Sequence, residues 1–231
     1  HCVEVARKVA AEISDELALP IFLYEHSAVT ESRRNLADIR RGSYEGLAAK
    51  LSLPEWAPDY GPGTPHPTAG ATVVGARDFL IAFNISLETK DVAVARDIAR
   101  RVRSVSSDGD IRLPFCKAIG WMMEGYQCAQ VSINLTNFRV TGMYDAFVAV
   151  SNEAARRGVR VRGSELIGLV PQAALLDVAS ASGISASVQS AEALSAAVSF
   201  LGLDQIAPFS LEEKVLEHQL ERVFQRRFEL R

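Results

Sequence analysis

Apolar residues recur at every fourth position near the start of the chain, at Val5, Val9, Ile13 and Leu17. This spacing predicts an amphipathic helix over residues 2–17, and Pro20 follows as a stop signal. Residues 21–24 are apolar and predict a short buried strand. Residues 30–51 are polar and Arg-rich and predict helix interrupted at Gly42, and the Pro-rich residues 52–70 predict a long loop.

From residue 79 onward, short apolar runs alternate with helical patterns. We expect strands at 79–87, 118–124, 127–138 and 159–170, and helices at 90–104, 141–157, 171–182 and 190–201. Gly125 and Tyr126 are placed to form a hairpin turn between the second and third strands. The resulting order, β-α-β-β-α-β, is the split-βαβ or ferredoxin-like order.

Two of these strands have one strongly apolar side and one polar side, because strand side chains alternate between faces. The apolar sides consist of Phe79, Ile81, Phe83, Ile85 and Leu87 in one strand and Val131, Ile133 and Leu135 in the other. The opposite positions are Leu80, Ala82, Asn84, Ser86, Gln130, Ser132, Asn134 and Thr136. This second face either meets solvent or forms a groove for a flat polar ligand. A solvated face usually carries Lys and Glu, and these strands carry neither, which favours the groove.

Composition indicates an ordinary globular protein. The 231 residues are 48% hydrophobic and 23% charged, with a net charge of −3. This balance gives no general attraction to nucleic acid or to anionic membranes. The three widely spaced cysteines predict neither a disulfide framework nor a zinc site, and they are typical of a reducing cytoplasm. No apolar run is long enough to cross a membrane, and no signal peptide is evident.

Several segments are candidates for chemistry, each with a purely structural alternative. Residues 70–77 are small and could expose backbone N–H groups to a ligand, or could form only a strand entry with a tight turn. Arg33, Arg34, Arg40 and Arg41 form either a carboxylate-binding rim or a solvated helix face. Glu165 stands in an apolar run, so it needs a ligand or a salt bridge to Arg160 or Arg162. The histidines form no triad and no metal motif, and His218 is expected to be exposed.

Long motifs across the chain resemble glutamate formimidoyltransferase, the formiminotransferase family. They are SRRNLADIRRGSYEGL, WAPDYGP followed by HPTAGATVVGARDFLIAFNISL, GWMMEG, AQVSINLTNF, GSELIGLVP and LGLDQIAPFS. The resemblance implies an α+β fold of two ferredoxin-like αβ subdomains whose sheets face each other across a folate tunnel. We expect residues 1–88 to be the C-terminal half of the first subdomain, which is incomplete, and residues 89–231 to be the second.

The resemblance also implies the reaction: transfer of a formimino group from N-formimino-L-glutamate to N5 of tetrahydrofolate, in histidine degradation and one-carbon metabolism. It implies folate binding at Gly70, Ala71, Thr72, Val73, Val74, Gly75, Ala76, Arg77, Asp78 and Phe79. Together with the polar face, it places Asn84, Gln130, Asn134 and Glu165 in the substrate tunnel. The implied enzyme is a cytoplasmic homodimer that uses tetrahydrofolate as co-substrate and no metal.

The family's catalytic histidine matches no position in this chain. The chain begins at His1, without Met and within a helical pattern, so we expect it to be a fragment that lacks an upstream segment or a companion chain. Val5, Val9 and Ile13 would then line an exposed apolar patch. Three hypotheses follow: a transferase completed by the missing part, a truncated, non-catalytic folate-binding or assembly module, or a partial gene product with no independent function.

Overall fold

The computed structural model describes residues 1–103, 113–183 and 190–229. Helices and strands are mixed, in an α+β fold, as expected. The chain divides into two units, His1–Arg77 and Asp78–Arg231, each with its own core. Residues 78–88, which we expected in the first subdomain, therefore lie with the second unit, because their strand pairs there on both sides.

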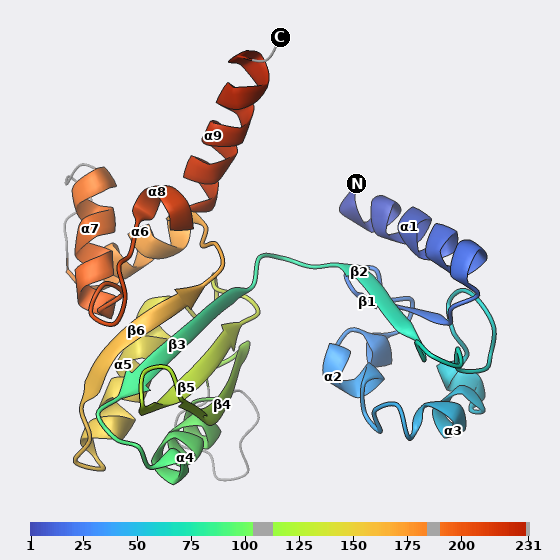
Figure 1. Cartoon of the computed structure of the whole chain (residues 1–231), viewed down its shortest axis with the longest axis horizontal. Helices are drawn as coiled ribbons and strands as arrows, with labels where there is room; N and C mark the ends of the chain where they lie inside the picture. The colour runs from blue at the N-terminus through green and yellow to red at the C-terminus, as the bar shows by residue number, and fades with distance from the viewer. Residues whose placement is uncertain (104–112, 184–189, 230–231) are drawn as a thin grey trace. The chain divides into compact units, whose positions relative to one another are not determined.

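The first unit is built on two parallel strands, β1 (Ile21–Glu25) and β2 (Thr72–Ala76). Helix α1 (Cys2–Leu17) packs on this pair (Figure 1). Its buried residues are the small Ala6, Ala10 and Ser14. Its bounds are those the apolar spacing predicted. The strand β2 and the parallel pairing were not expected.

The remainder of the first unit consists of short helical turns rather than the longer helix expected over residues 30–51. They are the 3-10 turn Glu31–Arg33, α2 (Leu36–Ile39), α3 (Leu47–Leu51) and the 3-10 turn Pro54–Trp56. On α1, Val5 and Val9 are 45% and 38% exposed, whereas Ile13 packs partly against Leu19 and Ile21. The expected apolar patch is therefore present at the two valines.

The second unit contains a four-stranded antiparallel sheet in the order β4-β5-β3-β6. The strands are β3 (Ile81–Leu87), β4 (Cys116–Met123), β5 (Cys128–Leu135) and β6 (Val161–Ile167). Helices α4 (Val92–Val102) and α5 (Met143–Ala155) complete the β-α-β-β-α-β order, and both pack on the sheet (Figure 1). The ferredoxin-like arrangement predicted from residue 79 onward is confirmed.

Four further helices follow the sheet. They are α6 (Gln172–Ala181), α7 (Ser190–Leu201), α8 (Leu211–Lys214) and α9 (Leu216–Glu229). Helices α6 and α7 pack together and contribute to the core of this unit. His218 on α9, expected to be exposed, is half-buried, and its Nδ1 lies 3.2 Å from the Leu211 carbonyl oxygen.

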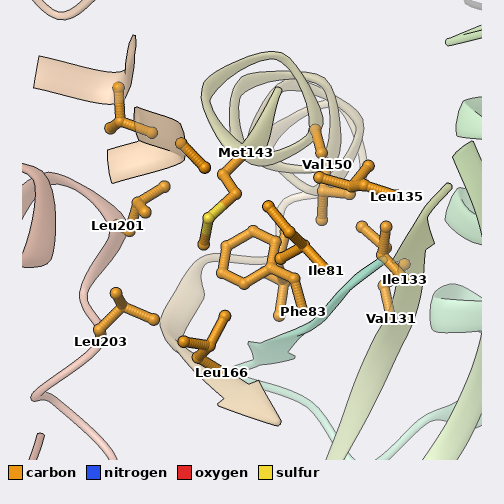
Figure 2. Packing of buried hydrophobic residues seen from close by; sticks show 14 of the residues in the cluster. Ile81, Phe83, Val131, Ile133, Leu135, Met143, Val150, Leu166, Leu201 and Leu203 are labelled. Carbon is orange, nitrogen blue, oxygen red and sulfur yellow. The ribbon is translucent and has the colours of Figure 1, made fainter. Parts of the chain in front are cut away.

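The core of the second unit lies between the sheet and its helices. Figure 2 shows the Phe83 ring at its centre, with Met143, Leu166 and Leu201 around it. Burial of several large apolar side chains here stabilises the unit by about 1.5–3 kcal/mol per side chain. Cys116 and Cys128 are also buried in this sheet, and all three cysteines are free thiols. No helix in the described part of the chain is both long and apolar enough to cross a membrane.

Candidate functional site

The face of the four-stranded sheet opposite Phe83 carries the polar residues picked out in the sequence. Strand register aligns them in rows: Ile119, Ser132, Asn84 and Glu165 form one row, and Trp121, Gln130, Ser86 and Gly163 form the next. We call these positions, with Lys117, Asn134, Ala82 and Ile167 of the adjoining row, the outer face. Asn84, Gln130 and Asn134 therefore lie on one face, as the alternation predicted, and the pairing of β3 with β6 places Glu165 on the same face.

Gln130 is the most deeply buried polar group of the outer face. Its side chain is 0% exposed, and its Nε2 donates to the Ser86 hydroxyl at 2.8 Å. Its Oε1 is buried without any hydrogen-bond partner. A buried acceptor without a donor costs about 1–3 kcal/mol, so native structures seldom leave one unless a ligand or another function requires it.

Glu165 is held by a tyrosine rather than by the salt bridge considered above. The Tyr126 hydroxyl donates to Glu165 Oε1 at 3.2 Å, while Glu165 Oε2 is buried without a partner. Arg160 pairs instead with Glu88, and Arg162 donates to the Tyr126 carbonyl at 2.9 Å. The interpretation of Glu165 as a salt-bridge partner of Arg160 or Arg162 was therefore wrong.

Tyr126 belongs to the turn between β4 and β5, where it bends back over the sheet. Burial raises the pKa of its phenol, and the neighbouring Glu165 carboxylate raises it further. The phenol consequently remains a hydrogen-bond donor at neutral pH and above. From the sequence, Tyr126 was identified only as a turn residue. The available signal for a role in the site was a long aromatic side chain with a hydroxyl group, next to Gly125 in the turn.

Apolar side chains surround these polar groups on the outer face. Ile119 on β4 and Ile167 on β6 are 63% and 48% exposed, and Trp121 lies beside Gln130 in register. Asn84 is almost buried at the centre of the face, and Asn134 is exposed at one end. A flat ligand with an aromatic surface and polar edges matches this combination, because apolar area supplies affinity and a few polar groups fix the orientation.

The segment Gly70–Phe79 crosses the division between the two units: residues 70–77 lie in the first unit and include β2, whereas Asp78 and Phe79 begin the second. Its two glycines have structural reasons: a Cβ at Gly75 would lie 2.4 Å from the Tyr24 carbonyl oxygen, and Gly70 has φ +69° beside the Tyr44 ring. Ala71, Thr72, Val73, Val74 and Ala76 are half-buried, whereas Arg77, Asp78 and Phe79 are exposed.

Backbone hydrogen bonds show which donors of β2 are directed outward. The N–H groups of Thr72 and Ala76 donate to the Pro20 carbonyl and to the Ser27 hydroxyl, on the β1 side. Alternate residues of a strand direct their N–H groups to opposite edges, so those of Val73 and Gly75 point away from β1. The N–H groups of Val73 and Gly75 therefore lie on the edge of β2 that faces away from β1.

The arginine pairs do not form a single rim. Arg33 is buried and pairs with Asp59 at 2.8 Å, whereas Arg34 and Arg41 pair with the nearby Glu31 and Asp38. Arg33 is therefore structural, and neither interpretation offered for the four arginines describes it.

A pocket of about 520 Å³ lies along α4 and β4, and Ile119 is the outer-face residue that it includes. It is lined by Ala93, Arg96, Ala99, Arg100, Arg103, Ala118, Ile119 and Gly120. Within the described ranges, no group of three or more His, Cys, Asp or Glu side chains is arranged to hold a metal ion.

Comparison with known proteins connects this geometry to one family. Residues 1–77 match the N-terminal subdomain of the formiminotransferase domain, and residues 82–221 match the formiminotransferase domain. The boundary between the two matches coincides with the division between the two units.

Individual relatives agree with this result. A glutamate formimidoyltransferase of Streptococcus pyogenes is 49% identical over 179 residues, which cover 78% of this chain and 58% of the relative. A glutamate formimidoyltransferase of Thermoplasma acidophilum is 41% identical over 180 residues, covering 77% of this chain and 58% of the relative. The formimidoyltransferase-cyclodeaminase of Sus scrofa is 40% identical over 224 residues, covering 94% of this chain and 41% of the relative.

The chain thus spans between 41% and 58% of the length of these relatives. Both of its units match, in order, the two parts of one domain. The chain belongs to the formiminotransferase domain family.

Proposed function

We propose that the polypeptide carrying this chain is a glutamate formimidoyltransferase that moves the formimino group of N-formimino-L-glutamate to N5 of tetrahydrofolate. Family membership and the names of the relatives support the reaction type. In this structure, the proposal is supported by the outer face, where Gln130 Oε1 and Glu165 Oε2 are buried acceptors without donors among the described residues. Both substrates present N–H groups that can fill these positions.

In the proposed reaction, N5 of tetrahydrofolate attacks the formimino carbon, whose carbon–nitrogen double bond opens to give a tetrahedral adduct, and N5 loses the proton that balances the one gained by the leaving group. The bond from that carbon to the glutamate nitrogen then breaks, and the nitrogen leaves as the amine of glutamate after gaining a proton. The outer face contributes positioning: Trp121 and Ile119 supply apolar contact, while Asn84, Gln130, Asn134 and Glu165 orient polar edges. Positioning of two substrates for reaction can account for several kcal/mol of the barrier.

We also assign folate contacts to Gly70–Phe79 from the resemblance, supported by the outward N–H groups of Val73 and Gly75. The guanidinium of Arg77 would bind a carboxylate of the glutamate tail. A role in histidine degradation, a cytoplasmic location and a homodimeric state belong to the same proposal.

The experiment measures glutamate release from N-formimino-L-glutamate with tetrahydrofolate, using the complete polypeptide that carries this chain. Gln130→Met keeps the side-chain length but removes the free acceptor. It should raise the Kd for the bound substrate about 10- to 100-fold, the effect of one lost buried hydrogen bond. Gln219→Met, on α9 and outside the face, is the matched control and should leave both turnover and Kd unchanged. Absence of both turnover and tetrahydrofolate binding in the unmodified protein would contradict the proposal.

A folate-binding module without catalysis is the second candidate. The observation that favours it is the chemistry of the outer face, whose polar strand positions carry amides, hydroxyls, one carboxylate and one lysine but no histidine to act as the common proton shuttle. Tight tetrahydrofolate binding that depends on Gln130, without glutamate release, would select this function over the transferase.

A further inference from the structure

The outer face contains two acceptors that receive no hydrogen bond from any residue that the structure describes. Gln130 Oε1 and Glu165 Oε2 are each buried and have no hydrogen-bond partner in the described chain. They project from β5 and β6, on either side of β3, in adjoining rows of the sheet. A carboxylate and an amide oxygen can only accept, so the complementary group has to be a donor.

Tyr126 determines which part of the Glu165 carboxylate faces the ligand. Its hydroxyl occupies one position on Oε1, at 3.2 Å, and its own main chain is tied to Arg162 at 2.9 Å. This hydrogen bond restrains the carboxylate on the Oε1 side, and no described residue donates to Oε2 or to the second lone pair of Oε1. A carboxylate held in this way binds two parallel N–H donors best, in the geometry known from Arg–carboxylate pairs.

Planar N–C–N groups with N–H on both nitrogens supply two parallel donors. Both substrates of the proposed reaction contain one. The formimino group of N-formimino-L-glutamate is an amidine, and the pteridine of tetrahydrofolate has an amino group next to a ring N–H. The shared chemistry is an amidine-like donor pair.

We propose that Glu165, positioned by Tyr126, determines specificity by binding an amidine-like N–C–N donor group of the substrate, and that Gln130 Oε1 accepts a further N–H from the same ligand. This inference rests on the proposed function, because it takes its two candidate ligands from that reaction. Glu165 touches the substrate, whereas Tyr126 is a positioning residue. A ligand in which an acceptor replaces one of the two N–H donors places that acceptor against a carboxylate oxygen of Glu165, so it loses a hydrogen bond and binds poorly.

The test measures Kd by titration calorimetry on the complete polypeptide, in two arms. One arm compares N-formimino-L-glutamate with N-formyl-L-glutamate, in which an oxygen replaces the terminal nitrogen. The other compares tetrahydrofolate with its 2-desamino-2-methyl analogue. In one of the two arms the natural ligand is the one that binds Glu165. There the Kd of the unmodified protein should be about 10- to 100-fold lower for the natural ligand than for the analogue, which corresponds to about 1.4–2.7 kcal/mol.

Each variant should change that preference in a particular way. Glu165→Met should reduce it to within about threefold, and Glu165→Gln, which keeps the shape and one acceptor, should leave an intermediate value. Tyr126→Phe should reduce the preference partially while retaining the folded state, since only the orientation of the carboxylate is lost. Glu88→Gln, a change to an exposed carboxylate that pairs with Arg160, should leave the preference unaltered.

The outcomes separate this inference from the proposed function. Loss of preference in the first arm identifies the formimino group as the ligand of Glu165, and loss in the second identifies the pteridine. If tetrahydrofolate binds and the preference survives Glu165→Gln and Glu165→Met in both arms, the inference is overturned and the transferase proposal stands. If the unmodified protein binds neither natural ligand, the proposed function fails, and this inference fails with it.

Discussion

Arg33 lies in a polar stretch of sequence, yet it is one of the few charged side chains buried in the first unit. It pairs with Asp59, which is also buried, and its Nη2 donates to the Glu55 and Ala57 carbonyls at 3.0 and 2.6 Å. Its guanidinium also lies 5.3 Å from the centre of the Phe22 ring. Asp59 in turn accepts the Leu23 N–H of β1 at 2.7 Å. The pair thus joins the Pro-rich loop to the edge of β1.

Replacing Arg33 should be far more damaging than replacing its neighbour. Arg33→Met leaves the Asp59 carboxylate buried without its partner, and breaking a buried ion pair in this way costs about 3–5 kcal/mol. Arg34→Met removes only an exposed pair with Glu31 and should change the free energy of unfolding by less than about 1 kcal/mol. Urea unfolding followed by circular dichroism measures both. Equal effects of the two substitutions would show that the Arg33 pair has no special role.

Among the elements, α4 approaches β4 so closely that only glycine fits at one position. A Cβ on Gly120 would lie 2.2 Å from the Arg96 backbone nitrogen and 2.3 Å from the Ala95 carbonyl carbon. The obstructing atoms belong to the helix backbone, so no side-chain rotation can relieve the contact. The position of α4 on the sheet therefore depends on this glycine.

Gly120→Ala should destabilise the second unit by about 1–3 kcal/mol or more, since the helix must move away from the strand. Gly125→Ala, in the turn at the other end of β4, meets no atom within 4 Å and serves as the control. Its effect should be within about 0.5 kcal/mol. Thermal unfolding of the two variants provides the comparison, and a Gly120→Ala protein as stable as Gly125→Ala would refute the argument.

Charged groups join α4 to the end of α5 and make this packing sensitive to pH. Arg157 binds both Asp97 and Glu153, the latter at 2.6 Å. The hydrogen bond from Arg157 lowers the pKa of Asp97 below its ordinary value of 3.8, against the opposing effect of burial. A carboxyl with a lowered pKa stabilises the fold above its ordinary pKa, and this contribution is lost as the pH falls through the lowered value.

Asp97→Asn should therefore reduce the free energy of unfolding at pH 7, by up to about 1 kcal/mol for a partly exposed group. The difference from the unmodified protein should shrink as the pH falls below about 4. Denaturant unfolding at a series of pH values measures this difference. A gap that stays constant or widens towards acid would contradict the assignment to Asp97.

The elements that the sequence predicted well are those with strong periodicity. The alternation in β3 and β5 places side chains on the correct faces without any knowledge of their neighbours. The apolar spacing predicted the bounds of α1 but not its packed face, because Val5, Val9 and Leu17 are exposed whereas Ala6, Ala10 and Ser14 are buried. Strand β2 was missed because Thr72–Ala76 is short and half-buried throughout, so it shows no alternation. The contact between Tyr126 and Glu165 joins residues 39 positions apart, and only the folding of the turn over the sheet brings them together.

At the scale of the whole molecule, the two units differ in how much core each contains. The second unit has one continuous cluster of apolar side chains, whereas the first has two small clusters around a two-stranded sheet. Two-stranded sheets are marginal by themselves, and small domains bury less of their surface. The second unit should therefore be able to fold without the first.

A polypeptide of residues 78–231 should show a single cooperative unfolding transition close to the more stable transition of the complete chain. Residues 1–77 alone should unfold with little cooperativity. Far-ultraviolet circular dichroism against urea concentration measures both. A fragment 78–231 without a cooperative transition would show that its core depends on the first unit.

The positions of the three cysteines allow the unfolding of the second unit to be measured by thiol labelling. Cys2 is exposed on α1, whereas Cys116 and Cys128 are buried in the sheet of the second unit, where burial raises the pKa of Cys116 to about 12. A thiolate is the reactive form, so a buried thiol with such a pKa is nearly inert until its surroundings open. A thiol reagent would label Cys2 at once and the two sheet cysteines only as the second unit unfolds. The rate at which Cys116 and Cys128 are labelled therefore reports the unfolding of the second unit, and the labelling of Cys2 in the first unit is the reference.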